Sequence, residues 1–142
     1  MTKPKLDLEI FDTKTSFVDL GLTTPLLKSI DKAGFDHPTV IQSKLIPLAL
    51  SGADILGQSR TGSGKTAAFG LPAIQILQEE DAFGSLILVP TRELAIQVCH
   101  ELRELGRFTK IHPVPIYGGQ KITTQIEKLK ANPQIIVGTP GR

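Results

Sequence analysis

The residues best suited to chemistry form one glycine-rich segment near the middle of the chain. Residues 59–66 read Ser-Arg-Thr-Gly-Ser-Gly-Lys-Thr, between an apolar run at 53–57 and a helical pattern that follows. In a strand–turn–helix context, glycines let consecutive backbone N–H groups face one concavity, and the helix start adds its positive dipole end. Lys65 supplies a charge for the β- and γ-phosphates, and the Thr66 hydroxyl can bind Mg²⁺. The segment predicts a nucleotide phosphate site.

The alternative interpretation is a purely structural turn, because strand-to-helix turns often contain glycine. Ser59 also stands where the strict P-loop pattern has its first glycine. Against this alternative, Lys65 in the first helical turn opposes the helix macrodipole, and packing offers no reason for it. Gly62 and Gly64 lower helix stability through backbone entropy without helping the helix to start. The expected phosphate-binding residues are Ser59, Arg60, Thr61, Gly62, Ser63, Gly64, Lys65 and Thr66.

Composition excludes several classes of protein. The 142 residues fit one domain, and 40% apolar with 21% charged residues is ordinary for a soluble globular chain. The formal charge of +2 is too balanced to indicate nucleic acid by itself. The single cysteine, Cys99, excludes an intrachain disulfide and is compatible with a reducing compartment. The chain has neither a signal-peptide pattern nor an apolar run that could span a membrane, so we expect a cytoplasmic protein without a membrane partner.

The elements that must position the glycine-rich segment alternate between helices and strands. Apolar runs predict strands at 53–57, 85–89, 112–117 and 134–138. Helical patterns lie at 24–33, 39–52, 65–77, 91–106 and around 122–129. Strands that alternate with helices of about 10–15 residues indicate βαβ units and a parallel sheet. Residues 1–15 show no period and are expected to be a flexible lead-in to a domain at 16–142.

Several local features are specific enough to be tested. Thr24 is a candidate N-cap with Pro25 in the first helical position, and Gly34 is a helix stop. The continuous apolar run at 85–89 predicts a strand covered on both faces. Cys99 is expected to be a small core residue. The side chains expected to be buried are Leu26, Leu27, Ile30, Ala33, Phe69, Ala73, Leu77, Leu94, Ala95, Val98, Leu102 and Leu105. The histidines, His37, His100 and His112, have no metal-ligand spacing.

Gln42 has two interpretations that remain open. Its spacing from Thr39 is that of a capping box, in which the two side chains bond each other's backbone. Its amide also carries donors and an acceptor, so it can pair with the donor–acceptor edge of adenine. The two roles are compatible with each other.

Taken in order, these motifs resemble the opening of a DEAD-box RNA helicase. Phe17 is followed by Gly-Phe-x-x-Pro-Thr-x-Ile-Gln at 34–42 and by the P-loop. Pro-Thr-Arg-Glu-Leu-Ala at 90–95, Gly118-Gly119 and Thr-Pro-Gly-Arg at 139–142 then arrive in the order of the family. The resemblance implies a RecA-like P-loop NTPase fold with a parallel sheet and helices on both faces.

The resemblance also implies roles for individual residues. Gln42 would recognise adenine, and either Phe17 or Phe35 would pack against it. The P-loop would bind ATP with Mg²⁺, with Lys65 stabilising the phosphates in catalysis. The residues implied to line a single-stranded RNA path are Pro90, Thr91, Arg92, Gly118, Gly119, Thr139, Pro140, Gly141 and Arg142.

The RNA assignment has a physical basis and a competing interpretation. Each of these turns joins a strand to a helix, where a capping threonine and free N–H groups can receive a phosphate. Such contacts depend on salt and are largely indifferent to base sequence. From the residues alone, helix capping is the favoured interpretation, especially for Thr91. The resemblance favours RNA contact.

The family's Asp-Glu-Ala-Asp motif, its Ser-Ala-Thr motif and its second domain are not found in the 142 residues. We therefore expect an incomplete sheet, a strand at 53–57 without its neighbours, and a chain that represents the front part of a longer helicase domain. The general base lies outside the chain, so the chain alone is expected to be inactive. The alternative is a naturally truncated, non-catalytic module that binds nucleotide or RNA and competes with a full-length helicase. A nucleotide kinase explains Lys65 but leaves the other motifs unexplained.

Overall fold

The computed structural model describes residues 10–142 and contains an α/β arrangement in which most helices precede the strands of the sheet. The chain begins with a short 3-10 helix, η2 (Phe17–Leu20). The α-helices are α1 (Thr24–Lys32), α2 (Val40–Leu50), α3 (Lys65–Ile76), α4 (Arg92–Leu105) and α5 (Ile122–Leu129). The strands are β1 (Ser85–Leu88), β2 (Pro113–Ile116) and β3 (Ile135–Gly138).

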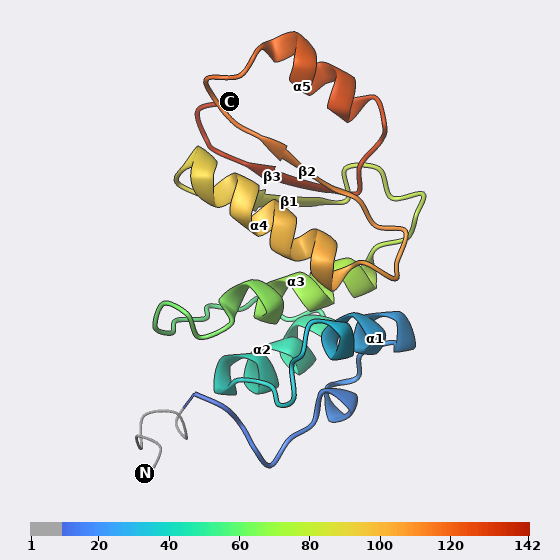
Figure 1. Cartoon of the computed structure of the whole chain (residues 1–142), viewed down its shortest axis with the longest axis vertical. Helices are drawn as coiled ribbons and strands as arrows, with labels where there is room; N and C mark the ends of the chain where they lie inside the picture. The colour runs from blue at the N-terminus through green and yellow to red at the C-terminus, as the bar shows by residue number, and fades with distance from the viewer. Residues whose placement is uncertain (1–9) are drawn as a thin grey trace.

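The sheet is parallel, as predicted, and its order is β1-β3-β2. Its register aligns Leu88 and Ile116 with Gly138, so the strands end level with one another. In Figure 1 the sheet lies between α4 on one face and α5 on the other, and α3, α2 and α1 follow beyond α4. Parallel strands need such crossover helices, because each connection must return to the same end of the sheet.

The core lies between the sheet and the stacked helices. Leu26, Ile46, Leu71 and Leu102 come from four different helices and are fully buried. Ile135 and Val137 of β3 are also inaccessible, which places the central strand of the sheet against this core. The predicted burial of Ala95, Val98, Leu105 and Cys99 on α4 is confirmed, whereas Leu94 is half-buried. The 3.6-residue period of α4 places these side chains on one face.

Segment 53–57, expected to be a strand, joins no strand in the described structure. The segment is thus not assigned as a strand, which corrects that part of the prediction, whereas the expected lack of neighbouring strands is observed. A strand exists only where a neighbouring chain accepts its hydrogen bonds, and local sequence cannot supply that neighbour. Leu56 in this segment is 99% exposed, so its side chain also lacks a covering element. The sheet is incomplete, as expected.

The face of β1 is a second correction. The apolar run at 85–89 predicts burial on both faces, but exposure alternates along the strand. Leu86 and Leu88 are 65% and 61% exposed, while Ser85 and Ile87 are half-buried. Helix α4 covers one face of the sheet, and α5 lies over the β2 side rather than over β1. Within the described residues no element covers this side of β1, so Leu86 and Leu88 remain exposed.

Three helix details also differ from expectation. The N-cap of α1 is Thr23 rather than Thr24, so the cap falls one residue earlier. Ala33 is exposed because α1 ends at Lys32, although Gly34 is a left-handed stop as expected, with φ of 76°. On α3 the expected Phe69, Ala73 and Leu77 are only half-buried. The residues that α3 does bury are Ala67, Ala68, Gly70, Leu71, Pro72 and Ile74.

Two further predictions concern strand β2 and the N-terminal lead-in. Strand β2 is an edge of the described sheet, as its prolines indicate. Ile10 and Asp12 pair with the backbone of 38–40, next to an isolated bridge between Phe11 and Thr39. This part of the expected lead-in therefore contacts the start of α2. The rest of the lead-in, residues 1–9, lies outside the described residues.

Candidate functional site

The glycine-rich segment forms a turn directly before α3, and its backbone is suited to an anion. Gly62 and Gly64 have positive φ angles of 76° and 80°, a region that side chains disfavour. Gly64 occupies the N-cap position of α3, but it has no side chain that could accept from the first N–H groups of the helix. The first N–H groups of α3 therefore have no side-chain acceptor, and a phosphate supplies what they lack. The donor set fits a nucleotide phosphate.

The side chains of the loop hydrogen-bond within the loop itself. Lys65 Nζ donates to the carbonyl oxygens of Ser59 and Arg60, at 2.7 and 2.8 Å. The hydroxyls of Ser59 and Ser63 are 2.6 Å apart across the turn. The ammonium group thus already faces two oxygen acceptors, and the phosphate oxygens of a nucleotide would be acceptors of the same kind. Thr66 is half-buried in the first turn of α3, next to this cluster.

Gln42 connects the start of α2 to the P-loop. Its capping role is confirmed, because Gln42 Oε1 accepts from Thr39 N at 2.9 Å and Thr39 Oγ1 accepts from Gln42 N at 3.4 Å. Its Nε2 donates to the carbonyl of Gly64 at 3.1 Å. A Cβ on Gly64 would collide with this Nε2. Gln42 and Gly64 are 22 residues apart, and no local sequence pattern indicates this contact. Recognition of adenine by Gln42 stays a prediction.

The aromatic residues of the predicted adenine site form a stacked pair. The ring centroids of Phe17 and Phe35 are 6.5 Å apart, with an angle of 26° between the planes. Phe17 is 6% exposed and belongs to the core, whereas Phe35 is 44% exposed. Only a ring with an accessible face can stack on a base, so the geometry favours Phe35 over Phe17 for that role.

The turns predicted to contact RNA meet at one edge of the sheet. Because the three strands end in register, Pro90 to Arg92 after β1, Gly118 and Gly119 after β2, and Thr139 to Arg142 after β3 gather at their carboxyl ends. In Figure 1 these segments and the P-loop lie on the same side of the molecule, at the left. The residues predicted to contact RNA are exposed at this edge, except the half-buried Thr139.

Contacts at this edge join turns that are distant in sequence. A Cβ on Gly119 would lie 3.4 Å from Arg92 Nη1, so Arg92 of α4 lies against the glycine turn. Arg142 Nη2 donates to the carbonyl of Gln120 at 3.3 Å. Arg92 Nε also donates to Glu93 at 2.7 Å, which raises the pKa of Arg92 and lowers the pKa of Glu93. The edge therefore combines two guanidinium groups with exposed backbone.

Thr91 acts as the N-cap that both interpretations allow. Its Oγ1 accepts from Leu94 N at 3.2 Å, so the helix-capping interpretation is confirmed. The hydroxyl hydrogen has no partner in that bond and can still donate to an acceptor such as a phosphate oxygen. Capping and RNA contact are therefore compatible at this residue.

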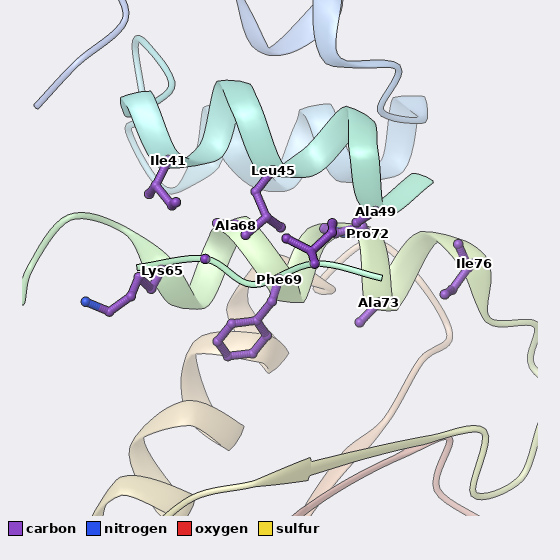
Figure 2. Close-up of a pocket in the computed structure, with 11 residues that line it drawn as sticks. Ile41, Leu45, Ala49, Lys65, Ala68, Phe69, Pro72, Ala73 and Ile76 are labelled. Atoms are coloured by element: carbon purple, nitrogen blue, oxygen red, sulfur yellow. The ribbon is translucent and has the colours of Figure 1, made fainter. Parts of the chain in front are cut away.

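An apolar groove of about 370 Å³ runs between α2 and α3 along segment 55–57. Leu45, Ala68 and Pro72 line it, and Figure 2 shows Lys65 at its end with the amine extending away from the apolar side chains. Gly57 packs closely here, since a Cβ on it would lie 2.9 Å from Leu45 Cδ1. Apart from Lys65 at its end, the groove is lined by apolar side chains and offers few donors to a phosphate, whereas the P-loop backbone and Lys65 offer several.

The remaining cysteine, histidine and acidic side chains of the described residues do not form a second site. Burial raises the pKa of the Cys99 thiol, whose Sγ donates to the carbonyl of Pro113 at 3.3 Å. Between residues 10 and 142, no three histidine, cysteine or acidic side chains gather closely enough to hold a metal ion. Within the same residues, no helix combines the length and apolar character that a membrane crossing needs.

Comparison with known proteins agrees with the motifs. Residues 39–142 match the family model described as DEAD/DEAH box helicase. The DEAD-box ATP-dependent RNA helicase RhpA of Helicobacter pylori strain B128 is 46% identical over all of this chain, which covers 30% of that relative. The helicase CshA of Geobacillus kaustophilus is 49% identical over 90% of this chain, and the match covers 28% of the length of CshA. The chain thus spans about a third or less of these relatives.

Solved structures resemble this one closely. The crystal structure of a DEAD box protein from the hyperthermophile Methanococcus jannaschii superposes with a TM-score of 0.85 at 47% identity, covering 89% of this chain and 35% of that one. A hypothetical ATP-dependent RNA helicase from Sulfolobus tokodaii gives a TM-score of 0.78 at 37% identity, covering 85% and 35% of the two chains. The sequence motifs, the parallel sheet and these matches agree, and the chain belongs to the DEAD/DEAH box helicase family.

Proposed function

We propose that this chain supplies the ATP-binding loop and part of the single-stranded RNA path of an ATP-dependent RNA helicase of the DEAD-box type. The observation that carries the proposal is the P-loop geometry: two glycines with positive φ precede a helix whose first N–H groups have no side-chain cap. Relatives named as ATP-dependent RNA helicases support it. The cytoplasm is the proposed location.

The nucleotide would be held by residues of three elements. Backbone N–H groups from Gly62 to Thr66 would bind the phosphates, with Lys65 neutralising their charge. Gln42 would pair with the edge of adenine, and Phe35 would stack on its face. Mg²⁺, when bound at the Thr66 hydroxyl, would supply charge stabilisation for the transferring phosphoryl group. Lys65 has no catalytic role other than electrostatic stabilisation in this proposal.

The RNA would contact the edge formed by the strand carboxyl ends. Arg92 and Arg142 would neutralise phosphates, while Thr91 and the backbone of Gly118 and Gly119 would donate hydrogen bonds to them. These groups contact the backbone of the RNA, so binding is expected to be independent of base sequence. Duplex unwinding coupled to ATP hydrolysis would be an activity of the whole protein.

The ATP proposal is tested with Lys65→Ala in the native protein. We expect RNA-stimulated ATP hydrolysis to fall by on the order of 10²-fold or more, the typical loss when one preorganised charge or donor at a reacting group is removed. Lys32→Ala, at the exposed end of α1, is the matched control and should retain activity. Undiminished hydrolysis in Lys65→Ala would contradict the assignment. Nucleotide and RNA binding without hydrolysis in the native protein would favour the non-catalytic alternative.

The RNA proposal is tested through salt dependence. Neutralising two phosphates of a single strand predicts a slope of about −1.4 in log K against log salt concentration. Arg92→Gln removes one of these cations and should reduce the slope by about 0.7. An unchanged slope in Arg92→Gln would place RNA elsewhere on the chain.

A further inference from the structure

Gln125 of α5 is buried, although the two isoleucines of the same helix are exposed. On α5 it is 3% exposed, while Ile122 and Ile126 of the same helix are 59% and 47% exposed. Burying a polar amide while leaving isoleucine exposed is unfavourable unless the amide is fully hydrogen-bonded. The location of Gln125 therefore indicates that its amide has a specific partner.

That partner is the backbone of Tyr117, the residue that follows β2. Gln125 Oε1 accepts from Tyr117 N at 3.0 Å, and Gln125 Nε2 donates to Tyr117 O at 2.7 Å. The amide bonds both polar groups of one residue, as a residue of a neighbouring strand would in a sheet. It thereby extends the support of β2 one residue beyond the end of the strand, directly before Gly118 and Gly119.

The glycine turn has few other contacts: Arg92 lies against Gly119, and a Cβ on Gly118 would meet nothing within 4 Å. Gly118 and Gly119 are exposed and have no side chains, and Gly119 has a φ of 84°. Beyond the turn, the carbonyl of Gln120 accepts from Arg142. The turn is therefore fixed at one end by the buried Gln125 amide and at the other by an exposed guanidinium group.

We infer that Gln125 is a positioning residue, which holds the Gly118-Gly119 turn in the conformation that presents its N–H groups to a phosphate of single-stranded RNA. The inference rests on the RNA path proposed above. A glycine turn without this support populates many conformations, and only the fraction in the right one binds without a conformational penalty. Gln125 acts through Tyr117 and does not touch the RNA.

Gln134 provides a matched control in the same sheet. It is 5% exposed, and its Oε1 accepts from His112 N at 2.9 Å, just before β2. Its Nε2 donates to the carbonyl of Glu79 at 2.7 Å. Each glutamine thus accepts from a backbone N–H at one end of β2, while Gln134 Nε2 also donates to the carbonyl of Asn132 at 3.3 Å, and only Gln125 adjoins the glycine turn.

The experiment compares Gln125→Met with Gln134→Met, because methionine keeps the side-chain length and removes both kinds of hydrogen bond. Affinity for a fluorescein-labelled oligouridylate is measured by anisotropy, and affinity for a fluorescent ADP analogue is measured in parallel. Loss of two hydrogen bonds lowers the population of the ordered turn, so RNA Kd should rise about tenfold in Gln125→Met. ADP affinity should be unchanged, and Gln134→Met should bind RNA like the native protein.

Hydrogen exchange provides a second measurement that does not depend on RNA. The amides of the glycine turn and of Tyr117 should exchange faster in Gln125→Met than in Gln134→Met. If Gln125→Met does not fold, Gln125→Asn keeps the amide, shortens its reach and should give the same changes.

The outcomes separate the inference from the proposed function. Native RNA binding with an unchanged Kd in the folded Gln125 variants would overturn the inference alone. An equal loss of RNA affinity in Gln134→Met would also overturn it, because the effect would then be general to the sheet. Absence of RNA binding by the native protein would overturn the RNA path and this inference together.

Discussion

The contact between Gly64 and Gln42 allows a quantitative test of how the P-loop is held. Gly64→Ala introduces a Cβ at a positive φ of 80°, and this Cβ would collide with Gln42 Nε2. The backbone conformation costs about 1 kcal/mol for a residue with a Cβ. The buried Gln42 side chain must also rotate, losing its bonds to Gly64 O and Thr39 N at about 1 kcal/mol each. The expected total loss of folding free energy is about 3 kcal/mol.

Gly62→Ala separates these two contributions. Gly62 has nearly the same φ, 76°, but a Cβ at this position would meet nothing within 4 Å. Its substitution should therefore cost only the backbone contribution, about 1 kcal/mol. Urea unfolding followed by circular dichroism measures both variants. In a Gln42→Ala background, the difference between the two alanine variants should disappear, since the colliding amide is absent.

Equal losses of stability in Gly64→Ala and Gly62→Ala would refute this reasoning. So would a difference between them that persists in the Gln42→Ala background, because the excess would then arise from some other neighbour of Gly64. Thr39 Cγ2 is the alternative, since a Cβ on Gly64 would lie 3.3 Å from it. The cycle thus tests the amide contact specifically.

Two further predictions concern the P-loop hydroxyls and the pH dependence of stability. Ser59→Ala removes the bond to the Ser63 hydroxyl across the phosphate-binding turn, which helps to order it, so ADP should bind about threefold more weakly by calorimetry, as expected for one modest hydrogen bond; tighter or unchanged binding would contradict this. The pKa of Asp19 is lowered because its carboxylate accepts from the Ser16 hydroxyl and backbone N–H. A lowered pKa stabilises the folded state above the ordinary value of 3.8, and this contribution is lost as pH falls from there through the lower folded-state pKa. Asp19→Asn should therefore flatten the acid side of the Tm profile below about pH 4. An unaltered profile would show that this capping box does not contribute.

Features set by neighbouring residues could be predicted from the sequence. The caps at Thr39 and Thr91 depend on a partner three residues away, and both are present. The buried face of α4 follows from its period, including Cys99. The parallel sheet follows from alternation of elements, and a parallel sheet brings the turns after its strands to one edge. The meeting of these turns at one edge follows from that alternation, whereas their assignment to RNA rests on the resemblance to DEAD-box helicases.

Features that depend on distant residues could not be predicted. Segment 53–57 has the apolar character of a strand, but a strand also requires a partner to accept its hydrogen bonds. The buried face of α3 differs from the predicted one because the helix is apolar around most of its circumference and lies between α2 and α4. The bond from Gln42 to Gly64 and the pairing of Gln125 with Tyr117 depend on tertiary geometry, which no spacing rule encodes.

Because segment 53–57 joins no strand in the described structure, nucleotide affinity at the proposed P-loop site is expected to depend on what pairs with this segment. Only Gln58 separates the segment from Ser59, so a chain that fixes the segment would also restrict the start of the P-loop. Ordering each residue costs about 1–2 kcal/mol, and a chain that pairs with 53–57 would supply that ordering before the nucleotide arrives. Linkage is reciprocal, so bound nucleotide would strengthen the pairing by the same factor. Strand addition at 53–57 and nucleotide binding at the proposed P-loop site would therefore each favour the other.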